Sequence, residues 1–322
     1  MSISNQIELW TESQSQNHLQ LLGSIVRDEL EKETLLRLDV SYLGDRINRW
    51  WLDRKDSPIT ECTHSSMVML IKETMQPAHL EVLKTIGSQK TRIAALLLKH
   101  AFTFINKDLA HLVHEAISEI AGIIDIKYPY EEHKELSPQS NLPMTSDWGR
   151  GLGIIRPHSD DLYEEQSINM MCLTVCKDTS RTATWFWMLK DITRCLTDEE
   201  LGYFALSEAT FLSGKNVEGK RIKVTKNILR RDSEEGMGLR LDFRICETVG
   251  PRMKCCDKKA QLIFNKMRLS LPHLKPHTSV PTEGSISVIS NYKVLHGRPS
   301  LNPVMLYDGT ASRIIFRSKG TK

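Results

Sequence analysis

The chain has 322 residues, of which 40% are hydrophobic and 26% are charged, enough to build a large core in one sizeable domain or two small ones. Its formal net charge of +3 is too small for this length to indicate nucleic acid or a membrane surface as a partner. No stretch approaches the ~18 apolar residues of a membrane span, and the polar start from Met1 to Leu19 lacks the apolar core of a signal peptide.

The first part of the chain has the spacing of amphipathic helices. Apolar residues recur at intervals of three and four over residues 17–36, 67–86 (with a break at Pro77), 91–104 and 107–124. We therefore predict a mostly helical N-terminal part over about residues 1–127. His111 and His114 lie on the last of these helices, but the order His-x-x-His-Glu does not match a metalloprotease, so we interpret them as surface or packing histidines.

The residue composition changes near Tyr128. Residues 128–153 are rich in Pro, Ser, Asn and Gly and indicate a long loop. Short apolar runs separated by turns follow at 168–175, 182–187, 239–245, 285–290 and 313–316, which predict the strands of a sandwich or barrel. One helix over 199–208, with Asp198 as its cap, interrupts them. The fold class predicted is mainly β with helices.

The seven cysteines indicate the compartment rather than the chemistry. Their number is odd and no two are spaced C-x-x-C, which argues against a structural zinc site. Together with the missing signal peptide, this pattern fits a reducing cytoplasm.

The most informative motif is Arg156-Pro157-His158-Ser159-Asp160-Asp161. In an extended segment, the side chains of His158 and Asp160 lie on the same side, because side chains alternate along a strand. His296, at the end of a strand-like run beside Gly297, is the best candidate for a third ligand. Two imidazoles and one carboxylate form the facial triad of non-haem iron. The alternative is a loop histidine held by a neighbouring acid.

Arg313 and Arg317 are four residues apart in an apolar segment, so they lie on the same face of a strand. Inward-facing arginines are costly unless each meets an anion. A guanidinium can bind a carboxylate through two parallel hydrogen bonds. A cosubstrate beside an iron site could provide this anion, and 2-oxoglutarate, which has a distal carboxylate, is one such cosubstrate. The alternative is a pair of edge-strand arginines that face solvent.

In this order, the motifs at His158–Asp160, His296–Arg298, Arg313 and Arg317 resemble the clavaminate synthase-like, TauD-type branch of the Fe(II)/2-oxoglutarate-dependent dioxygenases. The resemblance covers about residues 153–317. It implies a double-stranded β-helix, a cupin-like jelly roll buttressed by the N-terminal helices. It also implies a single oxygenase domain over residues 1–322, with the jelly-roll core at about 150–322.

The resemblance also implies roles for particular residues. His158, Asp160 and His296 would bind Fe(II), and the distal carboxylate of 2-oxoglutarate would meet Arg313 and Thr184, with Thr182 as the alternative to Thr184. Arg317 would bind the carboxylate or another anion of the substrate, and O2 would be the other reactant. Because Asp160 is present, hydroxylation or desaturation is favoured over chlorination. The long segments at 128–153 and 214–238 are candidate lids.

Asp161 and Asp242 point to the substrate. Members of this branch that act on basic amino acids often carry an acid after the iron ligand, and the segment around Asp242 is similar to the family's acid-bearing segment late in the fold. With Arg317, the two acids would suit a free basic amino acid of lysine or arginine type. The alternative is that Asp161 is solvated and that Asp242 pairs locally with Arg240 or Arg244.

Two rival interpretations remain. The same chemistry could act on a carboxylate without an amine or on a sulfonate, in which case Asp161 and Asp242 would have no cation to meet. A jelly-roll binding protein without catalysis is the other, although such proteins usually lose a ligand or the oxoglutarate arginine. A zinc hydrolase would leave Arg313 unexplained. The sequence predicts a small-molecule substrate and allows a homo-oligomer.

Overall fold

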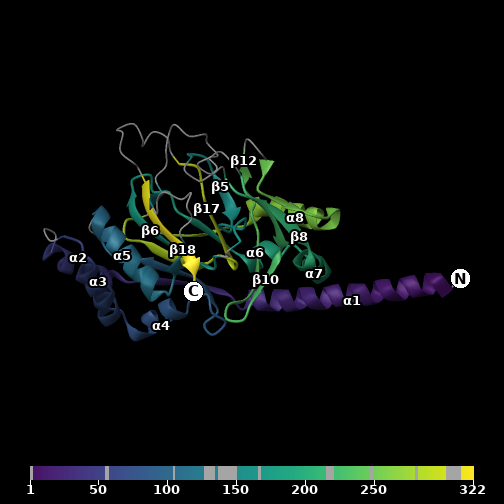
Figure 1. Cartoon of the computed structure of the whole chain (residues 1–322), viewed down its shortest axis with the longest axis horizontal. Coiled ribbons are helices and arrows are strands. Elements are labelled where there is room, and N and C mark those ends of the chain that lie inside the picture. Colours follow the sequence, from purple (N-terminus) through teal and green to yellow (C-terminus); the bar gives the residue numbers. More distant parts are fainter. Residues whose placement is uncertain are drawn as a thin grey trace.

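The computed structural model describes residues 3–54, 58–103, 106–126, 135–136, 151–165, 168–214, 221–246, 250–279, 282–301 and 313–322, and for residues 3–15 and 135–136 only the backbone. The fold is mixed α+β, with two main sheets between groups of helices (Figure 1). None of the described helices is both long and apolar enough to cross a membrane.

The larger sheet brings together strands from both ends of the chain. Its strands run in the order β1, β2, β16, β6, β18, β3, and β4 also pairs with β18. Only β1 and β2 are parallel to each other; the other pairs are antiparallel. The strand bounds are Thr34–Asp39 (β1), Ile93–Lys99 (β2), Ile286–Ser290 (β16), Met170–Asp178 (β6), Arg313–Thr321 (β18), Ile124–Asp125 (β3) and Glu135–Leu136 (β4).

The smaller sheet carries the candidate metal ligands. Its order is β15, β7, β17, β5, all antiparallel. The bounds are His277–Thr278 (β15), Trp185–Met188 (β7), Val294–Arg298 (β17) and Ile155–His158 (β5). An apolar cluster joins its inner face to that of the larger sheet, through Phe186, Met188 and Val294 on one side and Leu97, Leu173, Ile289 and Ile315 on the other. The two sheets therefore pack face to face.

Helices cover the outer face of the larger sheet. They are α2 (Ser41–Leu52), α3 (Glu61–Thr74), α4 (Pro77–Thr85) and α5 (Lys107–Ile120). Figure 1 shows this group at one end of the molecule. In α5, the side chain of Asn106 caps the first turn and the apolar positions turn inward, so the helix packs against β6 and β18.

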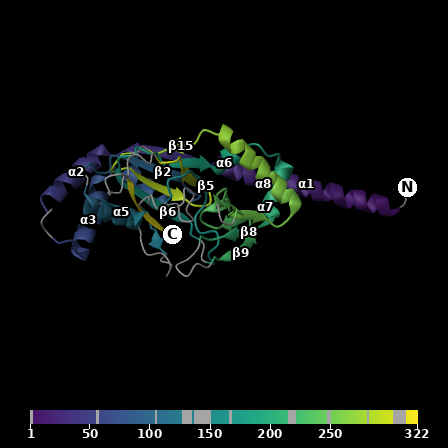
Figure 2. The ribbon, with the colours of Figure 1, turned by 90° about the horizontal axis from the view of Figure 1, so that it is seen from above.

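A second group lies against the smaller sheet and continues its core. It contains α1 (Ile3–Glu31), α6 (Leu189–Thr193), α7 (Asp198–Leu206), α8 (Lys258–Ser270) and the 3₁₀ turn Leu271–His273. The N-terminal part of α1 extends away from the body (Figure 2). Its later part packs closely on α7, where a Cβ at Gly23 would lie 1.7 Å from the carbonyl oxygen of Asp198. This position therefore requires glycine.

Short strands complete this side of the molecule. A three-stranded sheet runs in the order β14, β8, β9, and two hairpins pair β10 with β11 and β12 with β13. Their bounds are Glu208–Leu212 (β8), Lys223–Asn227 (β9), Leu229–Asp232 (β10), Gly236–Leu239 (β11), Ile245–Cys246 (β12), Gly250–Pro251 (β13) and Met253–Cys255 (β14).

The helix predicted over residues 91–104 was wrong, because Ile93–Lys99 is strand β2. Its residues are buried on both faces between β1 and β16, and such a strand forms a continuous apolar run that periodicity does not separate from a helix. The helix predicted over 17–36 also ends early, at Glu31, and β1 begins at Thr34. The N-terminal part therefore contributes three strands to the larger sheet, which are β1, β2 and the short β3.

Other predictions held or shifted slightly. The strands predicted at 168–175, 182–187, 285–290 and 313–316 correspond to β6, β7, β16 and β18. Thr197, rather than Asp198, caps α7 through a capping box with Glu200. Helix α8 was missed, although its cap Asp257 and apolar positions from Ala260 to Met267 are a recognisable signal.

Of the two predicted lids, at residues 128–153 and 214–238, only the second lies largely within the described residues. Residues 221–238 contain the strands β9, β10 and most of the β10–β11 hairpin, so this part of the 214–238 segment is a paired structure and not an irregular closing loop. Residues 215–220, and almost all of the predicted loop at 128–153, lie outside the described residues.

Candidate functional site

Strand pairing brings the two candidate histidines together. His158 ends β5 and His296 lies in β17, and the two are direct partners in the antiparallel register. Their ring centroids are 4.2 Å apart. Gly297 permits this approach, because a Cβ there would lie only 2.4 Å from the carbonyl oxygen of Ile155.

Asp160 completes the cluster from the turn that follows β5. The amide side chain of Asn291 fixes the backbone there: its Oδ1 accepts from the Asp160 N–H at 2.8 Å and its Nδ2 donates to the Asp160 carbonyl at 2.9 Å. Asp160 Oδ1 lies 3.2 Å from His158 Nε2, and Oδ2 lies 3.9 Å from His296 Nε2. The three candidate ligand atoms all lie within 4.8 Å of one another, and all three residues are buried.

The donor set and its surroundings fit a metal ion. The Nδ1 of His158 lies 2.9 Å from the carbonyl oxygen of Arg156, so this nitrogen donates to the backbone and Nε2 keeps its lone pair for a metal. Burial, together with His158, holds the pKa of His296 well below its usual value, which keeps the ring in the neutral, ligating form. Burial opposes ionisation of Asp160, but Arg317 and the two histidines outweigh it and hold the pKa of that carboxyl well below its usual range.

Chemically, two imidazoles and one carboxylate on one side of a cation suit iron(II), and the opposite side stays open for other ligands. The predicted ligands His158, Asp160 and His296 are thus brought together as the sequence indicated. They form a cluster from two strands of the smaller sheet and one turn.

The predicted oxoglutarate residues also meet. Arg313 is buried on the inner face of β18, and its Nη2 donates to the Oγ1 of Thr184 at 3.1 Å. Its Nε lies 3.3 Å from the Oδ2 of Asp178. Thr182 instead lies beside Asp178, where its backbone N–H donates to Oδ1 at 3.4 Å. The structure therefore places Thr184, and not Thr182, against the guanidinium of Arg313.

The ion pair of Arg313 with Asp178 is only partly formed. Both residues are buried, and burial lowers the pKa of Arg313 and raises that of Asp178. The Nε of Arg313 and the Oδ2 of Asp178 make no hydrogen bond in the described part of the chain. Because an unpaired buried donor is costly, this guanidinium is suited to take a further anion.

Arg317 lies on the same face of β18 as Arg313, two strand repeats further along the strand. Its Nη1 donates to Asp160 Oδ2 at 3.0 Å, so it joins the larger sheet to the metal cluster. The alternation along the strand confirms that the two arginines face inward, since Ile315 between them belongs to the inner apolar cluster.

A neighbouring arginine, Arg298 at the end of β17, binds backbone carbonyls. Its Nη1 donates to Gly153 at 2.8 Å and to Pro299 at 3.0 Å, and its Nη2 donates to Gly151. Burial, assisted by Arg313, lowers the pKa of Arg298 to about 9, which still leaves it cationic at neutral pH. Arg298 therefore ties the chain before β5 to the strand that carries His296.

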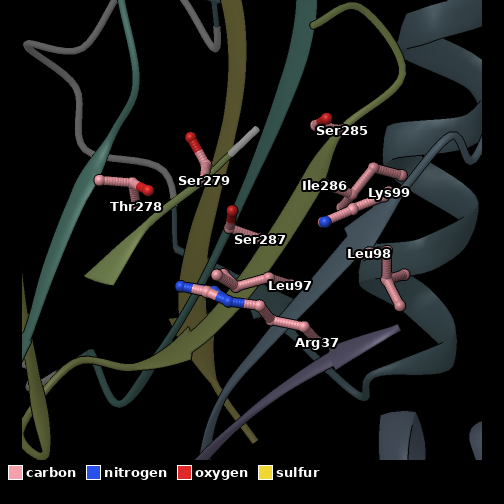
Figure 3. Close-up of a pocket in the computed structure, with 9 residues that line it drawn as sticks. All are labelled: Arg37, Leu97, Leu98, Lys99, Thr278, Ser279, Ser285, Ile286 and Ser287. Atoms are coloured by element: carbon pink, nitrogen blue, oxygen red, sulfur yellow. The ribbon is translucent and has the colours of Figure 1, made fainter. Parts of the chain in front are cut away.

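Figure 3 shows a pocket between β2, β16 and the end of β15. Its volume is about 10 Å³. The hydroxyl of Ser279 lies on it and accepts from the Thr184 N–H at 2.9 Å. This volume holds about one water molecule, so it is too small for a cosubstrate. A larger surface pocket of about 450 Å³, lined by Lys226, Arg230 and Arg240 among others, contains no residue of the metal cluster.

Asp161 is paired within the chain. It adopts a left-handed backbone conformation (φ 53°), and its Oδ2 forms an ion pair with Nζ of Lys319 on β18. Its Oδ1 accepts from the hydroxyl of Tyr163 at 2.9 Å. Burial, together with Asp161, raises the pKa of Tyr163 well above its usual value, so the hydroxyl stays a donor. Asp161 and Lys319 are both buried, with 3% and 4% of their surface exposed.

Asp242 lies beside the cluster but also has an internal partner. Its backbone forms a bridge with His158, which extends the smaller sheet by one short segment. The carboxylate forms a bidentate pair with the guanidinium of Arg244, with Nη2 to Oδ2 at 2.7 Å and Nε to Oδ1 at 3.0 Å. This is the local pairing that the sequence left open as the alternative.

From the sequence, Asn291 and Lys319 were not singled out, and Arg244 was named only as a possible local partner of Asp242. Asn291 positions Asp160, Lys319 neutralises Asp161, and Arg244 lies between Asp242 and Asp160. The signal for Lys319 was available, since it continues the inward-facing alternation of Arg313 and Arg317. The contact of Asn291 with Asp160 and that of Arg244 with Asp160 depend on chain segments far apart in sequence, and no local pattern indicates them.

No protein-family model matches the sequence, and no curated protein matches it either. Solved structures do match in fold. Asparagine oxygenase in complex with Fe(II), 2S,3S-3-hydroxyasparagine and succinate aligns with a TM-score of 0.65 at 13% identity, over 89% of this chain and 92% of that chain. The non-heme iron oxygenase OrfP with Fe and alpha-ketoglutaric acid aligns with a TM-score of 0.61 at 12% identity, over 89% and 94%.

A second OrfP structure, with Fe, succinate and (3R,4R)-dihydroxy-L-Arg, aligns with a TM-score of 0.66 at 11% identity over the same shares of both chains. The chain has the fold of these oxygenases. At such low identity the likeness concerns the fold alone.

Proposed function

We propose that this protein is an iron(II)- and 2-oxoglutarate-dependent oxygenase that hydroxylates an unactivated carbon of a small amino acid, with succinate and carbon dioxide as coproducts. The observation that carries the proposal is the convergence of His158, Asp160 and His296 opposite Arg313 and Arg317 on the facing strand. The fold shared with asparagine oxygenase and OrfP supports it. The two facing sheets would then be the halves of a double-stranded β-helix.

When bound at the triad, iron(II) with 2-oxoglutarate supplies the oxidising chemistry that uses O2 and converts 2-oxoglutarate to succinate and carbon dioxide. The chain's own residues hold and orient the reactants. Arg313 and Thr184 bind the distal carboxylate of 2-oxoglutarate through charge-assisted and neutral hydrogen bonds. Asp178 keeps the Arg313 guanidinium in place through its ion pair.

Arg317 orients the substrate by binding its carboxylate close to the metal. Its Nη1 already lies at the ligand carboxylate of Asp160, so a group held by this guanidinium lies next to the reacting centre. The apolar side chains between the two sheets, such as Phe186 and Leu173, keep water away from the site.

An amino acid is the substrate class that the comparisons favour. Structures of OrfP contain L-Arg or hydroxylated L-Arg, and that of asparagine oxygenase contains hydroxyasparagine. The sequence favours a basic amino acid, which rests on the family resemblance and on two acids, Asp161 and Asp242. Each of these acids already forms an ion pair with a cationic side chain of the protein. The class of amino acid therefore depends on which charged groups surround the end of the substrate's side chain.

The cytoplasm remains the predicted location. All seven cysteines lie within the described residues and none forms a disulfide there, as expected in a reducing compartment. The prediction of one oxygenase domain over residues 1–322 is likewise part of this proposal.

The proposal is tested by measuring oxygen consumption and succinate formation by the purified protein with Fe(II), 2-oxoglutarate and a panel of amino acids. We expect succinate to form only with iron, 2-oxoglutarate and O2 together, and one amino acid to gain a single oxygen atom in the mass spectrum. The variant Asp160→Ala should form none. If succinate never exceeds the level of the metal-free protein, the proposal is wrong.

A further inference from the structure

A second guanidinium borders the metal cluster, and the proposed function does not use it. Arg244 follows the segment that bridges His158, two residues after Asp242. Its Nη1 lies 3.9 Å from the Oδ1 of Asp160, and Arg317 donates to the other oxygen of the same carboxylate at 3.0 Å. Two cations, Arg317 of β18 and Arg244 of the segment that follows Asp242, therefore flank the candidate metal ligand.

The carboxylate of Asp242 is already saturated by Arg244. Its Oδ1 accepts from the backbone N–H of Arg244 at 2.9 Å and from Nε at 3.0 Å, and its Oδ2 accepts from Nη2 at 2.7 Å. Asp242 is buried, with 4% of its surface exposed. A cationic side chain of a substrate would thus find no open carboxylate oxygen here, and it would have to approach another cation.

Arg244 itself keeps one donor for a ligand. Its Nε and Nη2 are held by Asp242, which fixes the plane of the guanidinium. Its Nη1 makes no hydrogen bond within the described parts of the chain and lies nearest to Asp160. Burial opposes the charge, but Asp242 and Asp160 outweigh it and raise the pKa of Arg244, so the group stays a cation at every physiological pH.

We infer that Arg244 determines specificity: the oxygenase acts on an amino acid whose side chain ends in a carboxylate, of the aspartate or glutamate type. This inference rests on the proposed function. Arg317, beside the Oδ2 of Asp160, would take the α-carboxylate, and the Nη1 of Arg244, beside the Oδ1, would take the side-chain carboxylate. The guanidinium of Arg244 is charged in either case, but only a carboxylate is an ionised acceptor that neutralises it, so an acid is favoured over its amide.

The second acid, Asp161, fits the same picture. Lys319 and the hydroxyl of Tyr163 occupy both of its oxygens, so it offers no counter-charge for an ammonium or guanidinium group either. The distal carboxylate of 2-oxoglutarate has its own guanidinium in Arg313, which leaves Arg244 for the substrate.

The test is an anaerobic titration of amino acids into the protein loaded with Fe(II) and 2-oxoglutarate. Binding is followed by the change in the visible charge-transfer band, and turnover is followed afterwards in air by the mass of the product. We expect L-aspartate or L-glutamate to bind at least about 10-fold more tightly than L-asparagine or L-glutamine. The acid that binds should also be hydroxylated. L-Lysine and L-arginine should bind more weakly than the amides.

The decisive variant is Arg244→Gln combined with Asp242→Asn, because the pair then leaves no unpaired acid in the interior. We expect the KM for the acidic substrate to rise at least about 10-fold, because a charge-assisted contact is lost, and the KM for 2-oxoglutarate to stay within about twofold. Arg231→Ala, which removes an exposed arginine, is the matched control and should change neither value. Thermal unfolding monitored by circular dichroism establishes that both proteins are folded.

Three results would overturn the inference: preference of the unaltered protein for lysine or arginine, failure of both acids to bind, or a KM effect confined to 2-oxoglutarate. If the double variant does not fold, Arg244→Lys serves instead, since it keeps the charge but loses the fork and should weaken the acid selectively. Absence of the charge-transfer band before any amino acid is added would contradict the proposed function, and this inference with it.

Discussion

The two faces of the larger sheet carry buried polar residues of different kinds. On the outer face, His114 of α5 is fully buried and both ring nitrogens are satisfied, Nδ1 by the hydroxyl of Thr174 and Nε2 by that of Ser318, each at 2.9 Å. On the inner face, Arg313 donates to the hydroxyl of Thr184, and Arg317 donates to Asp160 of the metal cluster.

The two faces differ in whether their polar atoms have separate partners or approach one common point. Each polar atom of the His114 ring has its own hydroxyl, so this histidine completes a packed interface. The Nε2 atoms of His158 and His296 instead approach the same carboxylate, and the Nδ1 of His296 makes no hydrogen bond among the described residues. Burial of a histidine therefore does not by itself indicate a site, whereas several ligand atoms directed at one point do.

Removal of a cluster ligand should have the largest effect. In His296→Ala or Asp160→Ala we expect iron affinity to fall by more than about 100-fold, because the loss of an outer partner of a ligand already costs 10–100-fold. Equilibrium dialysis against Fe(II) under anaerobic conditions measures this. Unchanged iron binding in both variants would place the metal elsewhere.

The ion pair of Asp161 with Lys319 should come next. Because both partners are buried, Asp161→Asn should lower the free energy of unfolding by about 3–5 kcal/mol. Urea unfolding followed by circular dichroism measures it. The double variant Asp161→Asn with Lys319→Met should recover most of the loss, because it leaves no unpaired buried cation and Asn tolerates the left-handed backbone at this position.

Asp161→Asn also separates two roles for this residue. A variant with unchanged stability but much weaker substrate binding would show that Asp161 contacts the substrate, as the sequence predicts. A loss of stability with an unchanged KM for the substrate would identify the pair with Lys319 as structural.

Arg313→Ala should raise the KM for 2-oxoglutarate by about 10- to 150-fold, which corresponds to about 1.5–3 kcal/mol for hydrogen bonds to a charged group. Thr184→Val should raise it only about 2- to 12-fold, because a neutral hydrogen bond contributes about 0.5–1.5 kcal/mol. Initial rates of succinate formation at varied 2-oxoglutarate measure both. Equal effects of the two variants would exclude Arg313 as the main anchor.

The smallest effect on catalysis should come from the outer face. His114→Ala leaves two buried hydroxyls without their partner, so we expect a loss of about 1–3 kcal/mol in stability and an unchanged kcat per folded molecule. Thermal unfolding and steady-state rates on the same preparation measure it. A loss of iron from this variant would mean that the two faces are not independent.

Much of the site could be predicted from the sequence, because its parts depend on local patterns. Alternation along extended segments placed His158 with Asp160 and Arg313 with Arg317, and the structure brings these pairs and His296 together. The β6, β16 and β18 strands were predicted because turn residues bound each apolar run.

What failed depends on contacts between distant segments. The Ile93–Lys99 strand is buried on both faces by neighbours that no local pattern indicates, so its apolar run was taken for a helix. The partners of Asp161 and Asp242 decide whether these acids face a substrate, and Lys319 lies more than a hundred residues from Asp161 in the sequence. Only the folded chain shows that both acids are neutralised internally.

The central claim is that His158, Asp160 and His296 bind one iron(II) ion with room for 2-oxoglutarate. An anaerobic titration of the protein with Fe(II) in the presence of 2-oxoglutarate, followed in the visible range, tests it most directly. We expect a weak charge-transfer band that saturates at one iron per chain and is absent in His296→Ala. If the protein binds iron without this band, or if the band survives in His296→Ala, these three residues do not form the iron site of a 2-oxoglutarate-dependent oxygenase.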